Sequence, residues 1–158
     1  TFDCTVGSPP DGTVPAGVTF HPWCVGGADE MRAISSDRGF GKNGEKYQYY
    51  TLPTIVGMLG HGPGTARGGA VDLLKMDIER HEVTVIASLP DDTNQFRARQ
   101  TVFETHLHNT YGMFGRPVSH EEWAGMWSRL SALGYGTFSY EPNPLCRCCC
   151  EFSILRAD

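Results

Sequence analysis

The chain has 158 residues, of which 40% are hydrophobic and 20% charged, and its formal net charge is -5. This length and composition predict one globular domain over residues 1–158 and exclude a disordered chain. No block of Lys and Arg is present, so we expect no nucleic-acid partner. No apolar run approaches the roughly 20 residues that cross a bilayer, so we expect no membrane-spanning segment.

The first residue is Thr1 rather than Met, which predicts a processed or truncated product. A targeting signal would then precede Thr1. The compartment therefore stays open between the cytoplasm and a secretory lumen, and the oligomeric state stays open as well.

The first elements of the chain are short. Residues 18–25 are predicted to form a strand that Gly residues close, and the Gly-, Ser- and charge-rich residues 35–46 are predicted to form a loop. Residues 51–60 are predicted to form a helix. Thr51 caps that helix and Gly60 ends it.

The middle of the chain alternates strand, helix and strand. Residues 71–78 form an almost continuous apolar run, which predicts a strand covered on both faces. Residues 79–89 carry apolar side chains at helical spacing, and Pro90 follows them. Residues 100–108 are predicted to form the next strand.

The last third of the chain carries the clearest helix signal. Ser119 and Glu122 form a capping box, and Gly134 ends the helix. One apolar stripe runs along it, made of Trp123, Met126, Trp127, Leu130 and Leu133. Residues 137–141 and 151–155 are then predicted to pair as antiparallel strands, because the link between them is short.

Alternation of strands and helices predicts the fold class. We expect an α/β fold with a Rossmann-like, doubly wound and mostly parallel sheet, with helices on both faces and an antiparallel hairpin at the C-terminus. In such sheets ligands bind outside the carboxyl ends of the strands.

Carboxylates stand at two predicted strand ends. Asp77 and Glu79 end the strand over 71–78, and on an extended backbone they point the same way. They could bind a metal, accept from a substrate hydroxyl or contact a cofactor, or they could simply favour the positive end of the next helix. Asp3 follows what looks like the end of another strand, where an acid can bind ribose hydroxyls.

Glu104, His106 and His108 alternate along the strand over 100–108 and therefore share one of its faces. A half-buried His beside a carboxylate is suited to accept a proton near neutral pH. The same residues could bind a divalent metal together with Asp77, or His106 could be a structural residue bonded to backbone.

Six cysteines are present, four of them within residues 146–150. A structural zinc site would normally need a second pair of ligands at standard spacing, which the chain lacks. A disulfide within residues 146–150, a disulfide from there to Cys4 or Cys24, and reduced buried thiols remain the alternatives.

Four motifs in this order resemble one family. Residues 71–79 with Glu82 resemble the LK-D-E-G-E signature of FkbM-like S-adenosylmethionine-dependent methyltransferases, and the match is closer to their methyltransferase-like branch. The other three motifs are Glu104-Thr105-His106, the helix from Trp123 to Gly134-Tyr135, and the segment from Glu141-Pro142-Asn143 to Cys149-Cys150-Glu151-Phe152-Ser153.

The resemblance implies roles for particular residues. Asp3 would bind the cofactor ribose, and Asp77 would lie beside the methyl-transfer centre. From the residues themselves, we add Asp77 to the cofactor-binding set and Glu79 to the catalytic set. By analogy with related O-methyltransferases, His106 would be the base that activates the acceptor. The acceptor would be a glycan or another small molecule, methylated on oxygen.

The chain departs from the family pattern at two places. Arg80 and His81 stand where the family usually has Gly, and the first strand with its Gly-rich loop is missing, so the chain would be a partial, N-terminally truncated methyltransferase-like domain. We therefore expect weak or absent methyl transfer from these 158 residues alone.

Two other functions stay open. One is a catalytically degenerate methyltransferase-like binding domain. The other is a metal-dependent enzyme that uses Asp77, Glu79, His106 and His108, for which a divalent metal would be the cofactor.

Overall fold

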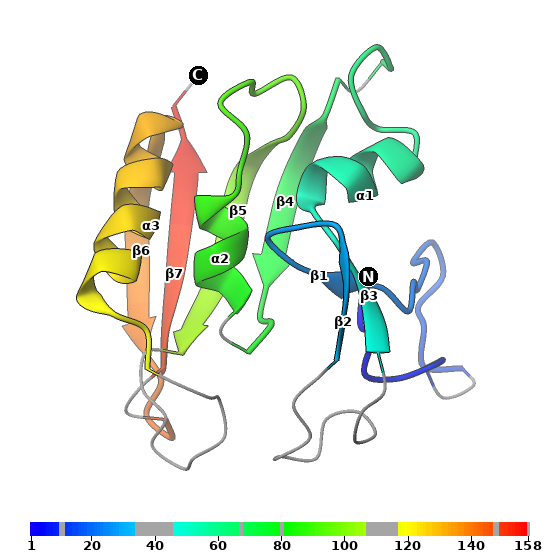
Figure 1. Ribbon diagram of the computed structural model, residues 1–158, viewed down its shortest axis with the longest axis horizontal. Coiled ribbons are helices and arrows are strands. Elements are labelled where there is room, and N and C mark those ends of the chain that lie inside the picture. The colour runs from blue at the N-terminus through cyan, green and yellow to red at the C-terminus, as the bar shows by residue number, and fades with distance from the viewer. Residues whose placement is uncertain are drawn as a thin grey trace.

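The computed structural model describes residues 1–9, 12–33, 46–66, 68–79, 81–106, 117–146 and 149–157. Within these ranges the strands form two sheets, one ordered β1-β3-β2 and the other β4-β5-β7-β6 (Figure 1). In chain order the elements are β1 (Cys24–Val25), β2 (Glu30–Ala33), β3 (Lys46–Tyr50), α1 (Leu52–Met58), β4 (Ala70–Met76), α2 (His81–Ala87), β5 (Arg97–His106), α3 (His120–Ala132), β6 (Tyr135–Pro142) and β7 (Cys149–Arg156).

The small sheet is built from the first 50 residues. β3 lies in its middle, parallel to β1 and antiparallel to β2. A disulfide joins Cys4 to Cys24, so the N-terminal segment is tied covalently to β1. Arg32 stacks on the Tyr49 ring at 4.3 Å from its centroid and contacts the His81 ring of α2 at 3.2 Å. These contacts connect the small sheet to the start of α2.

The larger sheet is organised around β5. On one side β5 pairs in parallel with β4, through α2 as the crossover helix, and on the other it pairs antiparallel with β7. β6 pairs antiparallel with β7, as the short link between them predicts. Both β4 and β5 therefore deliver their carboxyl ends to the same edge of the sheet.

Two of the helices begin at the caps that the sequence predicts. The Thr51 side chain accepts from the Thr54 N–H at the start of α1, and Ser119 and Glu122 form a complete capping box at the start of α3. The two caps satisfy N–H groups that have no partner inside a helix.

Helices α2 and α3 lie side by side on the same face of the larger sheet (Figure 1). The apolar stripe of α3 faces the core, with Met126 and Leu130 buried and Trp127 packed on Phe103 and Phe152. The buried core is made of Leu52, Val56, Met76, Val83, Val85, Ile86, Leu89, Phe96, Ala98, Phe103, Met126, Leu130 and Ile154.

The expected doubly wound Rossmann-like sheet is wrong. The chain forms a mixed α/β fold in which β4 and β5 are the one parallel pair of the larger sheet, while residues 24–50 pair among themselves in a separate sheet. Nor is β4 covered on both faces, because Leu73 is 58% exposed. A continuous apolar run indicated two-sided burial, but here only one face carries the core.

Element boundaries also shift. The strand expected over 18–25 contracts to β1 and an isolated bridge at His21, and the helix expected from residue 79 begins only at His81. β2 and β3 lack a recognisable sequence signal. The loop expected over 35–46 falls almost wholly outside the described residues. None of the helices in the described ranges is long and apolar enough to span a bilayer.

The Tyr135 hydroxyl forms hydrogen bonds with the backbone of β5, and removing this hydroxyl tests how much this contact between β6 and β5 stabilises the fold. Its hydroxyl donates to the Ala98 carbonyl at 2.7 Å and accepts from the Ala98 N–H at 3.0 Å, and Ala98 is fully buried. We expect Tyr135→Phe to lower the free energy of unfolding by about 2 kcal/mol, because it leaves both groups unbonded. Urea denaturation measures this loss.

The exposed Tyr140 on the same strand supplies the matched control, since Tyr140→Phe removes a hydroxyl at a surface position. An equal loss of stability in both variants would contradict the role of Tyr135. Burial raises the pKa of Tyr135 above 10, so the folded state favours the neutral phenol. The stability from this bond should be complete below pH 10 and decline as pH rises through the raised pKa.

Candidate functional site

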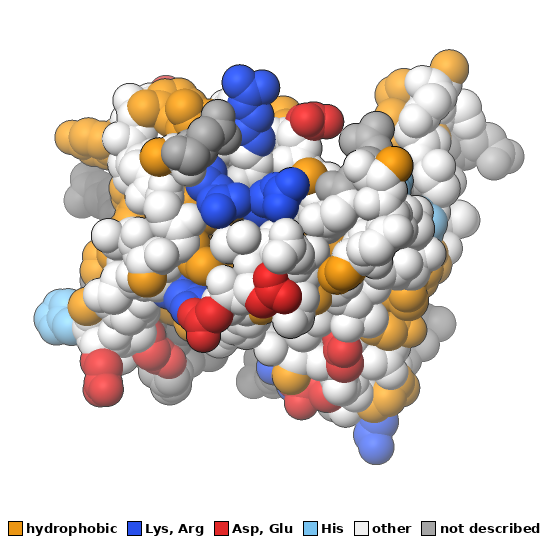
Figure 2. All heavy atoms as spheres, turned by 90° about the horizontal axis from the view of Figure 1, so that it is seen from above, with side chains coloured by type: hydrophobic (Ala, Val, Ile, Leu, Met, Phe, Trp, Pro, Cys, Tyr) orange, Lys and Arg blue, Asp and Glu red, His pale blue; other side chains and the backbone are white. Residues whose placement is uncertain are grey.

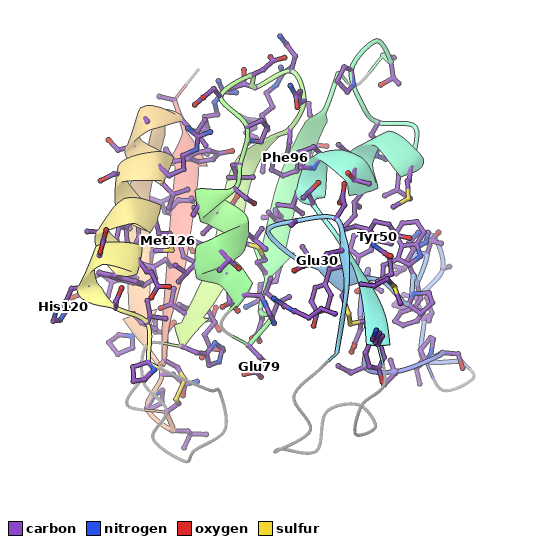
Figure 3. All side chains as sticks on the ribbon, viewed as in Figure 1. Glu30, Tyr50, Glu79, Phe96, His120 and Met126 are labelled. Carbon is purple, nitrogen blue, oxygen red and sulfur yellow. A yellow bond between two sulfur atoms is a disulfide. The ribbon has the colours of Figure 1, made fainter. Side chains whose placement is uncertain are left out.

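The turn between β4 and α2 presents a group of carboxylates. β4 ends at Met76, so Asp77 and Glu79 lie in this turn rather than on an extended strand, and Figure 3 shows Glu79 below the start of α2. Glu79 has a left-handed backbone, with φ 54°, which is unfavourable for a residue with a side chain. Glu82 in the first turn of α2 accepts from the Ile78 N–H at 2.7 Å and holds the turn in place.

His106 lies at the carboxyl end of β5 and is surrounded by acids. Its Nε2 is 3.3 Å from Glu79 Oε2 and 3.7 Å from Glu104 Oε2, while its Nδ1 is 3.8 Å from Glu82 Oε1. His106, Glu82 and Glu104 are all buried, and Glu82 has no exposed surface. The segment formed by the β4–α2 turn and the start of α2, together with β5 itself, thus brings three carboxylates to one imidazole ring. We call Asp77, Glu79, Glu82, Glu104 and His106 the acidic cluster.

Burial and mutual repulsion act on the charges of this cluster. Partial burial is the main cause that raises the pKa of the Glu79 carboxyl. His106 opposes that rise, and the carboxylates of Asp77 and Glu104 add to it. A carboxylate as deeply buried as Glu82 needs hydrogen bonds or positive charge beside it, since the cost of desolvation is several kcal/mol. The carboxylates of the cluster therefore favour a positively charged group or a bound cation beside them.

Two groups of side chains have the spacing of metal ligands. In one group, Asp77, Glu82 and His106 place one ligand atom each within 4.8 Å of one another. In the other, Glu104, His106 and Cys149 do the same, and all three of these residues are buried. The two groups share only His106, whose Nδ1 faces Glu82 and whose Nε2 faces Glu104.

The cysteines near the cluster are partly oxidised. Cys146 and Cys149 form a disulfide, which is one of the alternatives left open by the sequence, and Cys150 is a free thiol. Asn143 connects this loop to the cluster, because its Nδ2 donates to Glu104 Oε1 at 2.9 Å while its Oδ1 accepts from the Cys146 N–H. The loop before β7 is therefore anchored directly to Glu104.

The sequence-predicted site residues meet only in part. The structure brings Asp77, Glu79, Glu104 and His106 together. Asp3 makes local contacts instead, accepting from the backbone and hydroxyl of Thr5, so its ribose-binding role stays a prediction. His108 lies outside the described residues.

Sequence reasoning did not assign Glu82, Asn143 or Cys149 to a site. For Glu82 a signal was present, because an acid in the first turn of a helix can bond the backbone of the preceding turn. Asn143 and Cys149 reach the cluster through the pairing of β5 with β7, in which Cys149 stands opposite His106. No local pattern reports a register between strands so distant in sequence.

Lys and Arg side chains lie at the end of the larger sheet opposite the acidic cluster. Figure 2 views the molecule from above and shows Lys and Arg side chains near the middle of that face, with Asp and Glu side chains around them. This is the end where β5 begins at Arg97, whereas the acidic cluster lies at the end where β5 finishes. The carboxylates gathered at the cluster favour a positively charged ligand there.

The left-handed backbone of Glu79 gives a testable signature. Glu79→Gly and Glu79→Ala both remove the carboxylate, but only Gly adopts a positive φ without steric cost. We expect Glu79→Gly to be more stable than Glu79→Ala by about 1 kcal/mol, the reverse of the usual order. Thermal and urea unfolding of the pair measure the difference. A more stable Ala variant would show that the turn does not hold this conformation.

No family model, no curated protein and no solved structure matches this chain. The resemblance to FkbM-like methyltransferases rests on the four motifs alone.

Proposed function

We propose that the chain is an S-adenosylmethionine-dependent methyltransferase that acts on an oxygen of a sugar or another small acceptor. One observation carries the proposal: Asp77, Glu79 and His106 converge where β4 and β5, a parallel pair, both end. Ligand sites of α/β sheets form at such ends. The motif that supplies Asp77 and Glu79 is also the one that resembles the FkbM-like signature.

The residues of the cluster suit the needs of methyl transfer. When bound, S-adenosylmethionine supplies an already activated methyl group, so the protein has to align the acceptor and remove its proton. His106 accepts that proton at Nε2, which stands 3.3 Å from Glu79 Oε2. The Glu79 carboxylate then stabilises the imidazolium and fixes its orientation.

Asp77 fits the cofactor side of this site. It is exposed, unlike Glu82 and Glu104, and it stands at the first position after β4. An exposed carboxylate beside a buried His can accept hydrogen bonds from the amino or hydroxyl groups of a ligand that enters from solvent. Asp77 is therefore assigned to cofactor binding, and Glu79 and His106 to proton transfer.

Titration with S-adenosylhomocysteine tests the assignment without relying on turnover. We expect weak binding, with backbone NMR shifts centred on residues 76–79 and on His106. Asp77→Asn should weaken binding about tenfold, because a charged hydrogen bond contributes roughly 1.5 kcal/mol. Asp72→Asn is the control, since Asp72 is an acid on β4, the strand that precedes Asp77.

The outcomes separate the functions that the sequence left open. Equal NMR shifts in Asp77→Asn and Asp72→Asn, or no NMR shift at millimolar S-adenosylhomocysteine, would count against a cofactor site at the carboxyl ends of β4 and β5. Two results together would favour the catalytically degenerate binding domain. S-adenosylhomocysteine binding would survive Asp77→Asn, and His106→Gln would change neither that binding nor methyl transfer to simple hydroxylated acceptors.

A metal-dependent enzyme is the second candidate, and one observation favours it. The ligand atoms of Asp77, Glu82 and His106 lie within 4.8 Å of one another, which suits Mg²⁺ or Mn²⁺ bound by two carboxylates and an imidazole. Incubation with magnesium, manganese or zinc followed by metal analysis tests it. We expect one equivalent of manganese for the wild type if this candidate holds, and loss of most of it in Glu82→Gln. Glu121→Gln, on the exposed start of α3, should leave it unchanged.

A further inference from the structure

We propose that reduction of the Cys146–Cys149 disulfide creates a zinc site formed by Cys149, His106 and Glu104. The proposal uses the His106 Nε2, the nitrogen that also lies 3.3 Å from Glu79 Oε2, and it does not depend on methyl transfer, which zinc at this nitrogen would block. It begins from the observation that one ligand atom from each of these three buried residues lies within 4.8 Å of the other two.

The register of the larger sheet places the three side chains together. β5 and β7 pair antiparallel with Cys149 opposite His106, and directly opposite residues project from the same face of a sheet. Glu104 precedes His106 by two residues and therefore shares that face. The backbone alone thus brings a thiol, an imidazole and a carboxylate to one side of the sheet end.

The donor set matches zinc better than a hard cation. Zinc binds Cys sulfur, His nitrogen and carboxylate oxygen, and sites with three protein ligands leave a fourth position for water. Magnesium and calcium prefer oxygen ligands alone. The His106 Nε2 faces Glu104 at 3.7 Å, so the nitrogen on this side of the ring is the one that would bind the metal.

Asn143 positions the carboxylate for this role. Its Nδ2 donates to Glu104 Oε1 at 2.9 Å and leaves Oε2, the oxygen nearer His106, for the metal. Hydrogen bonds of this kind orient metal ligands, and their loss typically lowers affinity 10- to 100-fold. Asn143 also accepts from the Leu145 and Cys146 N–H groups, so it fixes the cysteine loop at the same time.

The disulfide controls access to the sulfur ligand. In the oxidised chain the Cys149 sulfur is bonded to Cys146, and a disulfide sulfur is a poor zinc ligand because the thiolate is the ligand form. A dithiol reductant supplies two electrons and two protons, the S–S bond breaks, and the reductant becomes a disulfide. Zinc then binds the Cys149 sulfur and displaces its proton to solvent.

Zinc affinity of the full chain, measured by competition with a chromogenic chelator, tests the proposal. We expect the reduced chain to bind one zinc ion about a hundredfold more tightly than the oxidised chain. Cys146→Ser is the decisive variant, because it leaves Cys149 as a free thiol and should bind zinc without any reductant. Cobalt in place of zinc should give a thiolate-to-cobalt charge-transfer band in this variant.

Controls separate this site from other thiols. Cys149→Ser and His106→Gln should each lose most of the affinity, and circular dichroism confirms that they fold. Cys150→Ser should bind zinc like the wild type, because Cys150 is a neighbouring free thiol that does not belong to the proposed site. The double variant Cys4→Ser/Cys24→Ser should also have the zinc affinity of the wild type, because the Cys4–Cys24 disulfide joins the N-terminal segment to the small sheet.

Three results would overturn the proposal. Zinc affinity that is the same in oxidised and reduced chains would show that the disulfide does not control the site. Tight binding that survives both Cys149→Ser and Glu104→Gln would place the zinc elsewhere. A folded Cys146→Ser variant that binds no zinc would show that a free Cys149 thiol is not sufficient.

Discussion

The register of β5 between its two neighbours determines both the core and the site. Its parallel pairing with β4 brings the turn that carries Asp77 and Glu79 to its carboxyl end, and its antiparallel pairing with β7 brings Cys149 opposite His106. A shift of β5 by one residue against both neighbours would turn its side chains to the opposite face. Phe103 would then leave the core at the same time as His106 left the acidic cluster.

In the acidic cluster, burial disfavours the charges that the side chains carry. Glu82 is fully buried, yet its carboxylate bonds the Ile78 N–H and lies 3.8 Å from His106. Glu79 holds a left-handed backbone that brings its carboxylate to 3.3 Å from the same ring. Strained backbone and buried charge are unfavourable individually, and they persist where surrounding structure holds them in place. Their coincidence at one imidazole is the main physical argument for a functional site.

The sequence predicted the local features and missed the long-range ones. Ser119 with Glu122 fixed the start of α3, because a capping box is a contact between neighbours in sequence. The apolar run of β4 indicated a strand but gave the wrong environment, since the exposure of Leu73 depends on what lies across the sheet. The separate β1-β3-β2 sheet was missed because its pairings join segments whose own sequences carry weak strand signals. The positive φ of Glu79 was also missed, because a Gly at this position would have indicated it and a Glu does not.

The connectivity of the larger sheet also orders its assembly. Ala70 of β4 pairs with Arg97 of β5, whereas Gln100 of β5 pairs with Leu155 of β7, a separation about twice as long. Each doubling of a loop raises its closure cost by only about 0.6 kcal/mol, but distant pairings form more slowly. The carboxylates of the β4–α2 turn can thus gather around His106 while the last strand is still undocked. The half of the site that contains sulfur is completed only when β7 pairs with β5.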